Sequence, residues 1–236
     1  MIENSTTENY AAATRRAHVP PLASLAAKVD PRHAALVVID MQNDFCADEG
    51  FIARAGRDVS AAQAMAKRLP ALIGAARDVG VRIVFVRSLY STARNNFLSD
   101  VWLEQAARRQ GGGYTRAPVC GEGSAGADFY GGVRPAPGDI VVTKHRYNAF
   151  HGTDLDLILR SNGVRTVVIS GVTTNVCVES TGRDGFMRDY YTVLVGDGTA
   201  AYTSEEHQTA LKTFDRYFGE VASIDDLAGL WARRNV

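Results

Sequence analysis

Residues 165–184 read RTVVISGVTTNVCVESTGRD, and this stretch decides the fold that we predict. Residues 166–170 form a short β-branched run, which is the composition of a buried parallel strand. We expect Gly171 to break that strand and residues 172–175 to form a polar turn. Helical spacing begins after the turn, so the strand, turn and helix together place Cys177 in the first turn of a helix.

A cysteine at the start of a helix can carry chemistry. The backbone N–H groups there are unpaired and the helix dipole is positive, so a thiolate is stabilised. A small buried hydrophobic residue would fit the same position. From this stretch alone, Cys177 is therefore either a nucleophile or a structural residue.

The composition is that of an ordinary globular protein, with 46% hydrophobic and 22% charged residues among 236. The formal net charge is zero, whereas proteins that bind nucleic acids or membranes usually carry a basic excess. Three cysteines at unrelated spacings form neither a disulfide framework nor a zinc ribbon. The first twenty residues lack the order of a secretory signal, so we expect a cytoplasmic protein.

Strands and helices alternate along the chain. Further apolar runs predict strands at residues 33–40, 81–86, 139–143, 191–195 and 217–222. Helical patterns lie at residues 60–78, 97–109, 154–161, 204–217 and after Ser223. Pro70 predicts a kink or a break in the first of these helices. This alternation is typical of an α/β protein with an open, doubly wound, mostly parallel sheet and helices on both faces.

Two segments differ from this pattern. Residues 1–30 are polar and alanine-rich, and we expect them to form an arm that packs on the surface or on a neighbouring subunit. Residues 31–236 are expected to form a single α/β domain. Within it, residues 91–138 form a long glycine-rich excursion, which in an α/β domain is usually a functional loop.

Three predicted strands bring chemically distinct groups to one edge of the sheet. Reactive groups in such sheets gather outside the carboxyl ends of the strands, where we expect Asp40, Lys144 and Cys177. A cysteine nucleophile needs a group that accepts its proton and a positive neighbour that holds the thiolate. Asp40 can be the base and Lys144 the positive neighbour. Each residue alone could be structural, but their coincidence at three strand ends favours a site.

Three motifs resemble those of the isochorismatase-like cysteine hydrolases. They are IDMQNDF at residues 39–45, the lysine after the third strand, and SGVTTNVCVES at residues 170–180. The resemblance runs from about residue 33 to residue 222. It implies a six-stranded parallel sheet and a catalytic triad formed by Asp40, Lys144 and Cys177.

The resemblance also implies the backbone geometry of the turn before the cysteine. The family has a non-proline cis peptide bond there, which corresponds to Val172–Thr173. Its oxyanion hole is made of two backbone N–H groups, which correspond to those of Thr173 and Cys177. Donors aimed at developing charge suit this chemistry.

A closer resemblance is to the ureidoacrylate amidohydrolases and their relatives, which include N-carbamoylsarcosine amidase and the biuret and triuret hydrolases. KHRYNAFHGTDLDLILRSNGVR at residues 144–165 and TNVCVESTGRDGF at residues 174–186 carry it. It implies hydrolysis of a C–N bond in a small linear ureide or carbamoyl amide, with release of ammonia or a carbamate. The resemblance also suggests a homodimer or homotetramer.

Four alternatives stay open. Isochorismatases that hydrolyse a vinyl ether lack the nucleophilic cysteine, so Cys177 disfavours this activity. Nicotinamidases carry an aspartate–histidine metal site after the second strand, but residues 87–100 contain no histidine. We therefore expect neither a metal nor another cofactor. A thiol sensor without hydrolysis and an inactive interaction module on the same fold are the other two alternatives.

The walls of the pocket are predicted from the loops at the strand ends. The candidate substrate-binding residues are Asn43, Phe45, Arg87, Tyr90, Asn95, Tyr147, Phe150 and Thr174. A substrate carboxylate would need a cation or a hydroxyl group, which Arg87 or Tyr90 could supply. An uncharged, biuret-like substrate would need amide partners such as Asn43 or Asn95. The two phenylalanines fit the core equally well.

Overall fold

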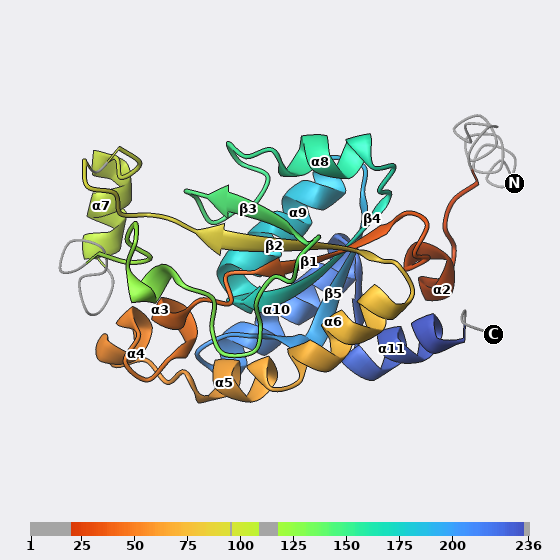
Figure 1. Ribbon diagram of the computed structural model, residues 1–236, viewed down its shortest axis with the longest axis horizontal. Coiled ribbons are helices and arrows are strands. Elements are labelled where there is room, and N and C mark those ends of the chain that lie inside the picture. The colour runs from red at the N-terminus through yellow and green to blue at the C-terminus, as the bar shows by residue number, and fades with distance from the viewer. Residues whose placement is uncertain (1–19, 95, 109–117, 234–236) are drawn as a thin grey trace, which may run out of the picture.

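The computed structural model describes residues 20–94, 96–108 and 118–233, and a six-stranded parallel sheet lies at its centre (Figure 1). The strands are β1 Ala34–Ile39, β2 Arg82–Ser88, β3 Ile140–Lys144, β4 Thr166–Val172, β5 Tyr191–Ala200 and β6 Glu220–Ala222. Their order is β3-β2-β1-β4-β5-β6, and every neighbouring pair is parallel. The predicted open, doubly wound sheet is therefore confirmed.

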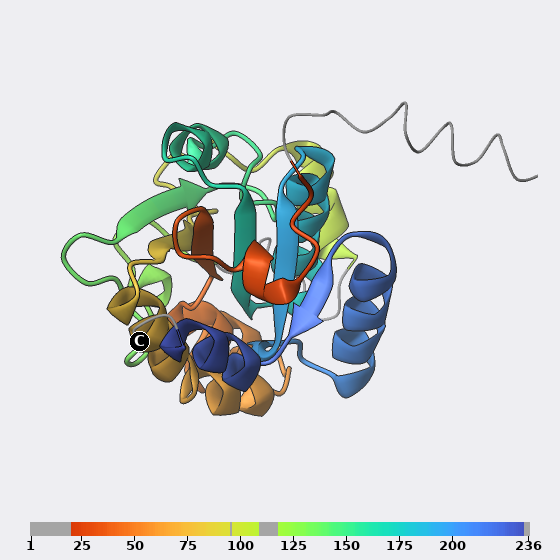
Figure 2. The same ribbon diagram turned by 90° about the vertical axis from the view of Figure 1, so that its right-hand side faces the viewer.

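Helices lie on both faces of this sheet (Figure 2). The α-helices are α2 Leu25–Lys28, α3 Asn43–Cys46, α4 Phe51–Arg54, α5 Ser60–Ala66, α6 Leu69–Asp78, α7 Asp100–Ala107, α8 Leu155–Ser161, α9 Glu179–Met187, α10 Ser204–Tyr217 and α11 Ile224–Ala232. The described part of the chain also contains a 3-10 turn, η2 Ala125–Ala127, and a π-helical turn, η3 Thr174–Val178. No helix in the described part of the chain is long and apolar enough to span a membrane.

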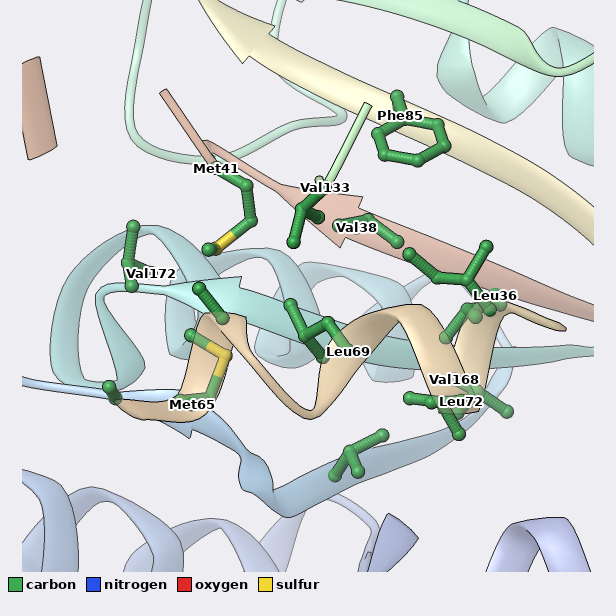
Figure 3. Close-up of a cluster of buried hydrophobic side chains, with 14 of the residues drawn as sticks. Leu36, Val38, Met41, Met65, Leu69, Leu72, Phe85, Val133, Val168 and Val172 are labelled. Carbon is green, nitrogen blue, oxygen red and sulfur yellow. The ribbon is translucent and has the colours of Figure 1, made fainter. Parts of the chain in front are cut away.

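Side chains of β1 alternate between two buried clusters, one on each face of the sheet. Leu36 and Val38 pack with residues of α5, α6 and α11, whereas Ala35, Val37 and Ile39 pack with residues of α8 and α10. Figure 3 shows the first cluster, in which Leu69 and Leu72 of α6 face these strand residues. Because all six residues of β1 are buried, the strand is apolar throughout. Each large apolar side chain that is fully buried contributes about 1.5–3 kcal/mol to the stability of the fold.

Gly171 does not end the fourth strand, so that prediction is wrong. β4 continues to Val172, and its register with β5 shifts between Ile169 and Gly171. Gly171 has φ +109°, and a Cβ built on it would lie 2.0 Å from the carbonyl oxygen of Ile39. Glycine thus permits a close approach of β4 to β1 while the pairing continues. In the same region, β5 runs to Ala200 and not to Val195.

The helix predicted over residues 60–78 is broken, as Pro70 indicated. It divides into α5 and α6, and Pro70 lies in the first turn of α6, where the missing N–H is harmless. The helix predicted over residues 97–109 is shorter and corresponds to α7.

The described part of the predicted N-terminal arm packs against the domain. The backbone N–H of Leu22 donates to the Tyr191 hydroxyl at 3.0 Å, and the Trp231 indole donates to the carbonyl of Val29 at 2.9 Å. Residues 1–19 of the predicted arm lie outside the described residues.

Candidate active site

Asp40, Lys144 and Cys177 meet at the carboxyl edge of the sheet, as their places after β1, β3 and β4 predicted. Asp40 follows β1 with φ +52°, a left-handed conformation that aspartate adopts more readily than most residues. Lys144 is the last residue of β3. Cys177 lies in η3, one turn before α9, and not in the first turn of a regular α-helix.

The Lys144 ammonium and the Asp40 carboxylate form a buried ion pair. Lys144 Nζ lies 2.8 Å from Asp40 Oδ2, and the exposed fractions of the two side chains are 0% and 1%. The Asp40 side chain is also hydrogen-bonded to the side chain of Cys177, so the carboxylate contacts both the ammonium and the thiol.

Ser88, the last residue of β2, joins the two members of this ion pair. Its hydroxyl donates to Asp40 Oδ1 at 2.9 Å and accepts from Lys144 Nζ at 2.8 Å. Lys144 Nζ also donates to the carbonyl of Arg146 at 3.0 Å and lies 3.5 Å from Cys177 Sγ. The ammonium is thus surrounded by acceptors, as a buried charge requires.

Burial and the two charges set the protonation states of this cluster. Burial lowers the pKa of Lys144, but the Asp40 carboxylate and the contact with Cys177 outweigh burial, so its pKa is raised and the group is an ammonium. Burial raises the pKa of Cys177 to about 12; Lys144 opposes that effect and Asp40 reinforces it. The resting group is therefore a thiol. Burial therefore outweighs the stabilisation that the helix start and the ammonium give to a thiolate.

The turn between β4 and α9 brings two backbone segments to the same place. The Val172–Thr173 peptide bond is cis. The carbonyl of Thr173 accepts from the N–H groups of Val176 and Val178 at 3.1 and 3.2 Å, which fixes the turn beneath the thiol. Both Thr173 and Cys177 line a cavity at this edge of the sheet.

A cavity of about 460 Å³ opens above Asp40 and Cys177. Its walls are mostly apolar and aromatic, with a few polar groups, which is the usual character of a small-molecule site. The other lining residues are Phe45, Phe51, Ile52, Ala55, Arg57, Tyr90, Ala106, Val119, Tyr147, Val172, Thr173, Asn175, Val176, Tyr202 and Glu206.

A family model described as the Isochorismatase domain matches residues 34–226, which contain every element of this site. The chain belongs to the isochorismatase family.

Known proteins of related sequence and structure agree with this membership. Ureidoacrylate amidohydrolase RutB of Pantoea ananatis is 34% identical over 203 residues, which cover 82% of this chain and 80% of that protein. N-carbamoylsarcosine amidase from Thermoplasma acidophilum superposes with a TM-score of 0.64 at 28% identity, over 82% of this chain and 97% of that one. A cysteine hydrolase from Pseudomonas syringae pv. phaseolicola shares the fold, with a TM-score of 0.77 at 24% identity over 91% and 98% of the two chains. The family and these relatives indicate a hydrolase that acts on amide C–N bonds.

Three of the predicted pocket residues line the cavity of this isochorismatase-family protein: Phe45, Tyr90 and Tyr147. The Tyr90 hydroxyl lies 3.3 Å from Lys144 Nζ, and the tyrosine is fully buried. Its place beside the ammonium makes it part of the wall nearest the ion pair.

Arg87 and Phe150 point away from the cavity, so their assignment to the pocket is wrong. Strand side chains alternate between the faces of the sheet, and Ser88 takes the inward position. Arg87 is therefore exposed and donates to Thr143 Oγ1 at 3.1 Å. Phe150 is buried in the cluster beneath α8 and α9, where it stacks on Tyr190.

Asn43 and Thr174 are engaged elsewhere and do not line the cavity. The Asn43 amide donates to the carbonyl of Ala125 at 2.8 Å, and so ties α3 to the 91–138 loop. Thr174 is fully buried, and its hydroxyl lies 2.9 Å from Nδ1 of His207. Asn95 lies outside the described residues.

Sequence reasoning missed Gln42, which supports Ser88. The Gln42 amide accepts from the N–H of Ser88 at 2.7 Å and donates to the carbonyls of Ser88 and Ala127 at 3.0 and 2.8 Å. This fully buried side chain therefore connects β1, β2 and the 91–138 loop. The sequence signal for this role was a polar residue, Gln42, two positions after Asp40 in the IDMQNDF motif.

Arg57, Tyr202 and Glu206 were also missed, and they form one side of the cavity. They come from the loop after α4 and from the start of α10, so their convergence depends on tertiary packing. Among the described residues, no group of three or more histidine, cysteine, aspartate or glutamate side chains is arranged to hold a metal ion.

Proposed function

We propose that the protein is a cysteine amidohydrolase that cleaves a C–N bond of a small linear ureide or carbamoyl amide through a thioester on Cys177. The convergence of Asp40, Lys144 and Cys177 at one cavity carries this proposal. A nucleophile, a base and a cation within direct contact are what thiol-based acyl transfer requires. The similarity to ureidoacrylate amidohydrolase supports the choice of substrate class.

Attack begins with a neutral thiol. As Cys177 Sγ bonds to the substrate carbonyl carbon, its proton passes to the carboxylate of Asp40, so no free thiolate accumulates. Asp40 is suited to take that proton, because its carboxylate is hydrogen-bonded to the Cys177 side chain and paired with Lys144. The electron pair of the carbonyl moves to its oxygen, which becomes an oxyanion.

The oxyanion needs donors fixed in advance. We assign this role to the backbone N–H groups of Thr173 and Cys177, both of which belong to residues that line the cavity. The Lys144 ammonium is 3.5 Å from Sγ and offsets the negative charge that builds up around the sulfur. Its ion pair with Asp40 also holds that carboxylate beside the thiol.

Collapse of the oxyanion breaks the C–N bond and leaves a thioester. The departing nitrogen takes the proton from Asp40. A water then attacks the thioester, gives a proton to Asp40 and releases the product, while that proton returns to Cys177 Sγ. Cleavage at the terminal nitrogen of a ureide releases ammonia, and cleavage at the internal nitrogen leaves a carbamoyl group that water releases as carbamate.

Ammonia release from a substrate panel tests this function. The panel holds ureidoacrylate, N-carbamoyl amino acids, biuret, triuret, maleamate and nicotinamide, each assayed with and without a chelator. Carbamate decomposes to ammonia, so both cleavage modes are detected. Turnover of a ureide that survives the chelator supports the proposal, including its metal-free character. Turnover of nicotinamide alone, or loss of ureide turnover with the chelator, contradicts it.

We also propose that the protein is a cytoplasmic homodimer or homotetramer, in which residues 1–30 contribute to subunit contacts. Gel filtration of the full chain and of a variant that lacks residues 1–30 tests the assembly. A smaller assembly for the truncated chain is expected. An unchanged elution volume would contradict the role of the arm.

A further inference from the structure

One side of the cavity carries two opposite charges that the proposed mechanism does not use. Arg57 lies in the loop after α4, and Glu206 lies in the first turn of α10. Arg57 Nη2 donates to Oε2 and Oε1 of Glu206 at 3.0 and 3.1 Å. Apart from Asp40, these are the two ionised side chains among the described residues that line the cavity.

The pair is asymmetric in its hydrogen bonding. Both oxygens of Glu206 accept from Arg57, and Oε2 also accepts from the Thr203 hydroxyl at 3.0 Å. On the guanidinium, Nη2 makes both of these bonds, whereas Nε and Nη1 donate to no described residue. The side chain of Arg57 is 40% exposed, and its guanidinium lies 5.6 Å from the ring centroid of Tyr202. Arg57 is therefore held in place at one nitrogen and has donors available on the other two.

Such a guanidinium suits the carboxylate of a ligand. The Nε and Nη1 groups of Arg57 point in different directions, and each can donate one charge-assisted hydrogen bond to a carboxylate oxygen. The substrate carboxylate was assigned from sequence to Arg87 or Tyr90, but Arg87 faces away and the Tyr90 hydroxyl lies beside Lys144. This leaves Arg57 as the cation among the described residues that lines the cavity and can take that role.

We propose that Arg57 determines specificity by binding a carboxylate at the end of the substrate remote from the carbamoyl group. This inference rests on the proposed ureide hydrolysis and narrows it to anionic ureides. Glu206 orients Arg57, but its negative charge opposes an anionic substrate. Removal of the two charges should therefore have opposite effects on anion recognition.

A pair of thiol reagents tests this charge effect without any substrate. Iodoacetate and iodoacetamide differ by a negative charge and alkylate the same Cys177 thiol, so the ratio of their rates cancels the pKa of the thiol. The ratio is measured on the Cys177 peptide by mass spectrometry. Arg57→Gln should lower it about tenfold, and Glu206→Gln should raise it severalfold, because charge-assisted contacts are strong in partly buried sites. Arg54→Gln removes an exposed charge outside the cavity wall and serves as the control.

Equal alkylation-rate ratios in the wild type and the three variants, or a shift in the same direction for Arg57→Gln and Glu206→Gln, would overturn the inference.

The kinetics of ureide hydrolysis give the second readout. Arg57→Gln should raise KM about tenfold to a hundredfold for ureidoacrylate or N-carbamoyl amino acids and much less for biuret. An equal change for both classes would also overturn it. Absence of ureide turnover in the wild type would refute the proposed function, while the alkylation ratio would still decide the charge recognition.

Discussion

Lys144 Nζ lies 2.8 Å from Asp40 Oδ2, and neither side chain is more than 1% exposed. Two charges so deeply buried are costly unless each is paired and hydrogen-bonded. The Ser88 hydroxyl, the Tyr90 hydroxyl and the carbonyl of Arg146 also accept from the ammonium. The ion pair therefore stands within a polar cluster beside Cys177.

Removal of the ammonium should raise the pKa of Cys177 further, because Lys144 lowers that pKa and Asp40 raises it. Lys144→Ala should slow alkylation of Cys177 by iodoacetamide at pH 9 about tenfold or more, since one pKa unit corresponds to a tenfold change in thiolate. The full pH profile of alkylation gives the measurement. An unchanged profile would reduce Lys144 to a structural role.

Removal of the Lys144 ammonium should also lower the free energy of unfolding by about 3–5 kcal/mol, because it leaves the Asp40 charge buried and unpaired. Denaturant unfolding of Lys144→Met, Asp40→Asn and the double variant separates the pair from its surroundings. The double variant should lose much less stability than the sum of the two single variants. Simple additivity would show that the two charges do not interact.

Ser88→Ala should impair catalysis through the positions of Asp40 and Lys144, which the Ser88 hydroxyl joins. We expect kcat to fall about tenfold to a hundredfold, with a smaller change in KM and a shifted pH profile, since two buried groups each lose a partner. Ser88→Thr retains the hydroxyl and should recover part of the rate. Equal losses in the two variants would point to packing as the cause.

Alkaline pH should destabilise the protein through its buried thiols. Burial raises the pKa of Cys177 and of Cys46 to about 12 in the folded state, well above the roughly 8.5 of an unfolded cysteine. The thiol forms therefore stabilise the fold fully below pH 8.5, and this stability is lost as pH rises towards 12. Within that window, each thiol lowers the free energy of unfolding by about 1.4 kcal/mol per pH unit. Cys177→Ala should show a shallower decline of unfolding free energy between pH 9 and 11, and a slope equal to that of the wild type would contradict the burial argument.

Gly171→Ala should be strongly destabilising, because its Cβ would lie 2.0 Å from the Ile39 carbonyl oxygen at a φ of +109°. We expect a loss of about 3 kcal/mol or more, through backbone strain and separation of β1 from β4. Gly74→Ala in α6 is the matched control, since nothing lies within 4 Å of its added Cβ. That variant should gain about 0.5–1 kcal/mol in thermal or denaturant unfolding. A small effect at Gly171 would show that the two strands can move apart readily.

The sheet and the convergence of Asp40, Lys144 and Cys177 could be predicted because both depend on local patterns. β1 and β4 are apolar runs of strand length, and parallel strands bring their carboxyl ends to one edge. The structural role of Gly171 could not be predicted in this way. A glycine that ends a strand and one that lets two strands approach closely have the same local sequence.

The cavity walls were only partly predictable. Arg87 was assigned to the pocket although strand alternation gives the inward position to its neighbour Ser88. Phe150 follows β3 closely but is buried in the apolar core, where it stacks on Tyr190. Arg57 and Glu206 are 149 residues apart in sequence and meet only through packing, so no motif could join them.

The turnover rate of Cys177→Ala on the ureide that the wild type hydrolyses best tests the central claim most directly. Circular dichroism and thermal unfolding first establish that this variant is folded. The proposed thioester predicts a loss of about a thousandfold or more in kcat, because removal of a nucleophile leaves only binding and oxyanion stabilisation. A variant that hydrolyses the ureide at near wild-type rates would contradict the account.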